Sequence, residues 1–136
     1  MWHDGGRPLF EDAARARARE SDILAQNGQM CGAVYLAGYV VECRLKTLLN
    51  KMGKPFHTSG SAGHDLLGLW DATGLPKAQR GGFRRAFLEY WNTSMRYSAD
   101  INSGHSSEDL LKGAVELASF LQSKIVHTRG VRRRRS

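Results

Sequence analysis

The chain has 136 residues, which is enough for one domain with its own hydrophobic core and too few for two domains of ordinary size. Hydrophobic residues make up 41% of the chain and charged residues 24%, a balance that excludes global disorder. The net charge is +7, but five of the 20 basic residues are arginines within residues 129–136. Without them, 15 basic residues face 13 acidic ones, so the excess positive charge belongs mainly to the tail.

The sequence predicts a cytoplasmic protein that needs no metal or cofactor. No apolar run is long enough to span a bilayer, and the residues after Met1 do not resemble a secretory leader. Cys31 and Cys43 lie in one predicted helix, which would separate them by ~18 Å, beyond the reach of a disulfide. No group of histidines and cysteines has the spacing of a zinc site.

The first half of the chain predicts two long helices. The first begins at Pro8 and ends near Asn27 and Gly28. The second covers 29–52 and ends at Gly53. Its broad apolar stripe indicates the central helix of a bundle. The main positions of that stripe are Met30, Val34, Ala37, Val41, Leu45 and Leu48. Glycines inside a helix are unfavourable, so Gly32 and Gly38 predict close approach by a neighbour.

The second half predicts a loop over 54–63, a short helix over 64–73, a helix over 76–91, a polar segment over 92–104 and a last helix capped by Ser106. From His127 onward we expect disorder. The expected domains are an N-terminal extension over 1–8, a helical domain over 9–126 and a basic tail over 127–136. The expected fold is all-α, an antiparallel up-and-down four-helix bundle with one additional short helix.

Three stretches of the sequence carry a resemblance to a known family. They are LAGYVVECRLKTLL at 36–49, GHDLL at 63–67 and MRYSAD at 95–100, followed by the last amphipathic helix. In this order, and over about residues 9–126, the chain resembles HEPN domains, which are helical RNA- and nucleotide-associated domains of prokaryotic toxin–antitoxin and defence systems. The resemblance implies a homodimer that acts on RNA or on a nucleotide.

Many HEPN domains are metal-independent endoribonucleases that use an arginine and, after four to six residues, a histidine. The resemblance implies Arg96 as the arginine, but positions 101–103 hold Ile101, Asn102 and Ser103, and the nearest histidine is His105. The candidate catalytic pair is therefore Arg96 as phosphate clamp and His105 as acid and base. The departure in spacing leaves open whether the protein cleaves RNA or only binds it. The alternative is a non-catalytic partner that binds and regulates a nucleotidyltransferase.

Five further residues are candidates for binding: Glu42, Lys46, Tyr97, Asp100 and Asn102. Glu42 and Lys46 lie four residues apart and therefore share a helix face. They either form an intrahelical ion pair, or Glu42 is turned inward and orients Arg96, because a buried carboxylate needs a partner. Tyr97 would then add a hydrogen bond. Asp100 lies four residues after Arg96 and could instead pair with it.

Two other charged features have alternative interpretations. His64 and Asp65 predict the start of the short helix, with Asp65 at its positive end. The basic clusters are Arg80, Arg84, Arg85 and residues 132–135. Each cluster is either a solvated surface or a set of phosphate contacts.

Overall fold

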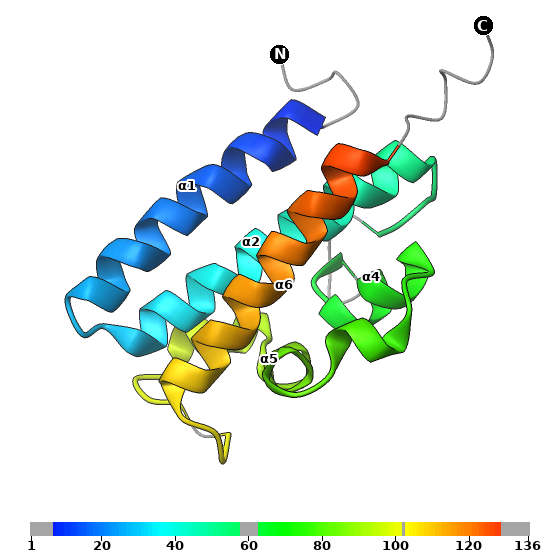
Figure 1. The fold of residues 1–136 in the computed structure, drawn as a ribbon. Helices are drawn as coiled ribbons and strands as arrows, with labels where there is room; N and C mark the ends of the chain where they lie inside the picture. Colours follow the sequence, from blue (N-terminus) through cyan, green and yellow to red (C-terminus); the bar gives the residue numbers. More distant parts are fainter. Residues whose placement is uncertain (1–6, 58–62, 102, 129–136) are drawn as a thin grey trace, which may run out of the picture.

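The computed structural model describes residues 7–57, 63–101 and 103–128. Within these ranges helices are joined by turns and loops and no strand occurs, which confirms the all-α class (Figure 1). The α-helices are α1 (Arg7–Gln26), α2 (Met30–Met52), α4 (Leu66–Thr73), α5 (Phe83–Tyr90) and α6 (Ser107–His127). Two short 3₁₀ helices, η1 (Lys77–Arg80) and η2 (Thr93–Tyr97), flank α5. None of the helices in these ranges combines the length and the apolar character needed to cross a membrane.

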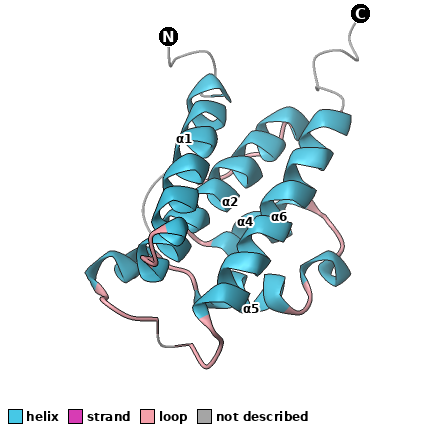
Figure 2. Ribbon diagram, turned by 60° about the vertical axis from the view of Figure 1, so that its left-hand side comes forward, coloured by secondary structure: helices cyan, strands magenta, loops and turns pink. Residues whose placement is uncertain are grey.

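Three long helices, α1, α2 and α6, form the body of the molecule (Figures 1 and 2). The chain reverses between α1 and α2 at Gly28, whose φ of 75° favours glycine, so these two helices run antiparallel. Helix α2 lies centrally and packs against α1, α4 and α6. The side chains of Val34, Val41 and Leu45 are completely buried, as the apolar stripe predicts.

The ends of the helices confirm the boundaries expected from local sequence signals. Gly53 ends α2 in a left-handed conformation with a φ of 71°. The carboxylate of Asp65 accepts a hydrogen bond from the backbone N–H of Gly68 and caps α4. The hydroxyl of Ser106 accepts one from the N–H of Asp109 and caps α6.

The predicted helix over 76–91 is wrong as one element. It is interrupted at Gly81 and at Gly82, which has a φ of 61°, so η1 and α5 are separate. Figure 1 shows α5 nearly end-on and α6 lengthwise, so α5 crosses α6. The up-and-down arrangement of four helices is therefore not confirmed.

The structure also differs from the sequence prediction in the segment over 92–104 and at the start of the C-terminal tail. The polar segment over 92–104 contains η2. His127 belongs to α6, so the disorder expected from His127 onward does not begin there. Residues 1–6 and 129–136 lie outside the described residues.

Gly38 is the point of closest approach between α2 and the segment that follows α5. A Cβ atom at Gly38 would lie 1.9 Å from the indole ring of Trp91, so only glycine fits there. The indole Nε1 of Trp91 donates a hydrogen bond of 2.9 Å to the carbonyl of Tyr35. The tight packing predicted at Gly38 is thus confirmed, and it seats residues 91–97 against α2.

Candidate functional site

A stripe of polar and aromatic side chains runs along one face of α2. Tyr35, Tyr39, Glu42 and Lys46 follow one another at steps of four, three and four residues, which places them in one row on the helix. The C-terminal end of this row is buried, with Glu42 5% and Lys46 2% exposed, whereas the two tyrosines are half-buried. The row therefore leads from the core of the protein to its surface.

Glu42 is the centre of a buried charged cluster. One of its carboxylate oxygens, Oε2, accepts a hydrogen bond of 2.9 Å from the ammonium of Lys46. The other oxygen, Oε1, lies 2.8 Å from Nδ1 of His64, whose side chain is 32% exposed. Both oxygens of the carboxylate are therefore occupied, one by a lysine of the same helix and one by a histidine that precedes α4.

The contact with Glu42 fixes the orientation of the His64 ring. A carboxylate in an ion pair with a lysine can only accept hydrogen bonds, so Nδ1 of His64 must be the donor. When the imidazole is neutral, its second nitrogen, Nε2, then carries the lone pair. Within the described residues no side chain or backbone group forms a hydrogen bond with Nε2.

Tyrosine and tryptophan rings border this cluster. The Tyr39 ring packs edge-on against His64, at 6.2 Å between ring centres, and against Trp91, at 5.1 Å. The hydroxyls of Tyr35 and Tyr39 are 2.9 Å apart and share a hydrogen bond. Burial, followed by the hydrogen bond with Tyr35, raises the pKa of the Tyr39 phenol, so Tyr39 stays neutral at physiological pH.

Arg96 in η2 lies at the exposed end of the row. Its guanidinium stacks on Tyr97, with 4.8 Å between the guanidinium carbon and the ring centre. Hydrogen bonding to Tyr97, and then to Tyr35, raises the pKa of Arg96, so it remains a cation. The side chain of Arg96 is exposed, and 79% of Tyr97 is exposed. An arginine and an aromatic ring are therefore both presented to solvent.

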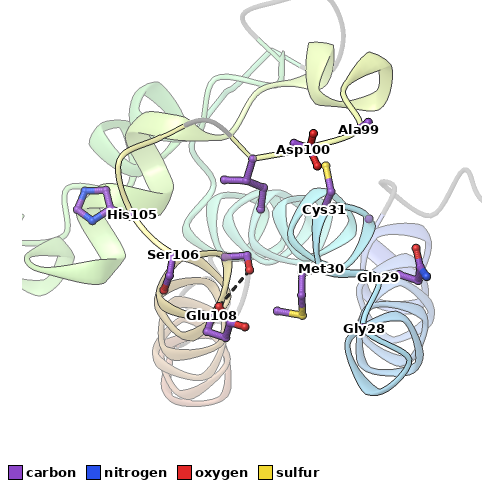
Figure 3. Close-up of a pocket in the computed structure, with 12 residues that line it drawn as sticks. Gly28, Gln29, Met30, Cys31, Ala99, Asp100, His105, Ser106 and Glu108 are labelled. Atoms are coloured by element: carbon purple, nitrogen blue, oxygen red, sulfur yellow. Dashed lines mark hydrogen bonds between the residues drawn. The ribbon is translucent and has the colours of Figure 1, made fainter.

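His105 lines a cavity of about 530 Å³ together with Asp100 and Cys31, and Arg96 is not among the residues that line it. Figure 3 shows the His105 ring pointing away from Asp100 and Cys31. Among the described residues no hydrogen bond joins Arg96 and His105, and their pairing as a catalytic site stays a prediction.

Several of the expected contacts differ in the structure. Glu42 is turned inward and forms the expected ion pair with Lys46, but its second partner is His64 and not Arg96. Tyr97 contacts Arg96 and forms no hydrogen bond with Glu42. The expected pair of Arg96 and Asp100 does not form among the described residues, and Asn102 lies outside them.

His64 was missed because its sequence context indicates only the start of a helix. That expectation holds for Asp65, which caps α4, but His64 itself reaches back to α2. The signal that could have identified it is Glu42, because a carboxylate inside an apolar helix requires partners from elsewhere in the chain.

The basic cluster on α5 is largely paired with acidic residues. Arg85 binds Glu89 on the same helix, and Arg84 lies 3.4 Å from Glu116 of α6. Arg84 also donates to the carbonyl of Gln79. These contacts favour the interpretation of a solvated helix face over that of a phosphate-binding ridge. Nothing is described of the side chain of Arg80.

Over residues 7–57, 63–101 and 103–128, no three His, Cys, Asp or Glu side chains are grouped so that they could hold a metal ion. No protein-family model, curated protein or solved structure matches the chain.

Proposed function

We propose that this protein binds single-stranded RNA, in the manner of the HEPN domains that its sequence resembles. The observation that carries the proposal is the exposed pair of Arg96 and Tyr97, in which a permanent cation lies on an aromatic ring that is 79% exposed. Proteins bind single strands by combining positive charge for the phosphates with aromatic rings for the bases.

The surroundings of the pair suit this task. The guanidinium of Arg96 stacks on Tyr97 and donates to the carbonyl of Thr93, and Trp91 fixes the segment on α2. The cation and the ring are therefore positioned before RNA arrives, which lowers the entropic cost of binding. Tyr35 and Tyr39, both half-buried, extend the aromatic surface toward His64.

The finer parts of the proposal rest on the resemblance. They are a four-helix up-and-down bundle of the HEPN type, a homodimer in which two copies of Arg96 face one cleft, and a cytoplasmic role in a toxin–antitoxin or defence system. The alternative is a non-catalytic partner that binds and regulates a nucleotidyltransferase. That alternative is favoured by the position of His105, which lines a cavity whose lining does not include Arg96.

RNA binding is tested by Arg96→Ala and Tyr97→Ala. We expect each variant to bind a fluorescent single-stranded RNA about tenfold more weakly than the parent, because one loses the phosphate contact and the other the stacking platform. The measurement is fluorescence anisotropy at fixed ionic strength.

Arg85→Ala is the matched control, since it removes one exposed positive charge from α5. It should bind RNA as the parent does. Equal weakening by Arg85→Ala and Arg96→Ala would show that only the net charge matters and would refute the proposed surface.

A further inference from the structure

We propose that His64, held by Glu42, is the general base of RNA cleavage at this surface and that His105 takes no part. The inference rests on the proposed RNA binding and adds a reaction and a catalytic residue to it. Its basis is the contact of 2.8 Å between Nδ1 of His64 and the buried carboxylate of Glu42.

The Glu42 carboxylate orients His64, although Glu42 does not need His64 to neutralise its charge. The buried carboxylate already has a full positive charge from Lys46 at 2.9 Å. The additional bond to His64 fixes the imidazole with one nitrogen donating inward and leaves Nε2 without a partner among the described residues. A carboxylate that orients a histidine in this way is the arrangement that prepares an imidazole to accept a proton.

His64 is accessible from the solvent. About a third of the His64 side chain is exposed, although its carboxylate partner is almost fully buried. The Tyr39 ring packs against His64 on one side, and the Tyr39 hydroxyl shares a hydrogen bond with Tyr35. The positive charge of Arg96 acts on the pKa of Tyr39 and lowers it, so Arg96 lies near the two tyrosine hydroxyls. The α2 positions of Tyr35 and Tyr39 are separated by roughly 6 Å of helix rise. His64 and Arg96 thus lie beside neighbouring tyrosines of the same row, His64 next to Tyr39 and Arg96 near Tyr35.

The reaction is an internal transfer of the phosphate ester. Nε2 of His64 takes the proton of the ribose 2′-hydroxyl, and the 2′-oxygen forms a bond to the adjacent phosphorus. The bond from phosphorus to the 5′-oxygen breaks, and that oxygen takes a proton from water. Arg96 binds the non-bridging oxygens, on which negative charge develops. The products are a 2′,3′-cyclic phosphate and a 5′-hydroxyl, and His64 returns its proton to the solvent.

The test uses His64→Asn, with His105→Asn as the matched control. The amide nitrogen of asparagine can replace Nδ1 as the donor to Glu42, but asparagine has no group equivalent to Nε2. The parent protein, incubated in EDTA with a short single-stranded RNA, should produce ends with a 2′,3′-cyclic phosphate, identified by mass spectrometry. A DNA strand of the same sequence should not be cut, because it lacks the 2′-hydroxyl.

We expect His64→Asn to cleave RNA slower by about 100-fold or more, with unchanged RNA affinity and thermal stability. His105→Asn should cleave as fast as the parent. A parent protein that binds RNA without cleaving it would overturn this inference and leave the proposed function standing. Undiminished cleavage by His64→Asn would overturn it as well, and loss of cleavage in His105→Asn alone would assign the reaction to the pair expected from the sequence.

Discussion

Gly38→Ala should destabilise the protein by about 3 kcal/mol, because the added methyl group has no space. Its Cβ would lie 1.9 Å from the Trp91 indole, and Trp91 is buried and held by its bond to Tyr35. The indole and residues 91–97 would have to move away from α2. Thermal unfolding followed by circular dichroism should show a Tm lower by about 10 °C.

Gly32→Ala, six residues earlier in the same helix, is the matched control. There a Cβ would lie 3.2 Å from the terminal methyl carbon Cδ1 of Leu24, which can rotate aside. The gain in helix propensity of up to ~1 kcal/mol offsets that adjustment. If both variants unfolded at the same temperature, the close approach of Trp91 to Gly38 would not be what makes Gly38→Ala destabilising.

The second large effect is expected for Lys46→Met, which removes one partner of the buried ion pair. Methionine fills a similar volume, but Oε2 of Glu42 then remains in the core without its cation. Removing one member of a buried ion pair typically costs about 3 kcal/mol or more. Urea denaturation should therefore show a lower midpoint with an unchanged slope.

The double variant Glu42→Leu with Lys46→Met distinguishes charge from packing. It has no buried charge left, since His64 is partly exposed and can be hydrated. Replacing both members of a buried pair by apolar residues is often neutral or stabilising, so the double variant should be more stable than Lys46→Met alone. A double variant less stable than the single one would mean that packing of the lysine chain, and not its charge, stabilises this region.

The sequence predicted those parts of the fold that depend on local signals. The stops at Gly28 and Gly53 and the cap at Ser106 are each determined by a few neighbouring residues, and all three are confirmed. The helix expected over 76–91 was wrong because the consecutive glycines at 81 and 82 interrupt it and leave η1 and α5 as separate elements. The extended Gly81 ends η1, and Gly82, with a φ of 61°, precedes the start of α5.

The candidate site was only partly predictable for a similar reason. Glu42 and Lys46 are four residues apart, and helix geometry alone brings them together. Glu42 and His64 are 22 residues apart, and their contact depends on how the start of α4 packs against α2. No local pattern encodes that packing. The sequence therefore indicated that Glu42 needs a partner, but the predicted partner was Arg96.

The central claim is that RNA lies on the surface formed by η2 and the tyrosines of α2. Photo-crosslinking with a single-stranded RNA containing 4-thiouridine, followed by mass spectrometry of the digested protein, tests it most directly. The account predicts crosslinks at Tyr97 and at Tyr35 or Tyr39. Crosslinks confined to α5 and α6, or to residues 129–136, would contradict it.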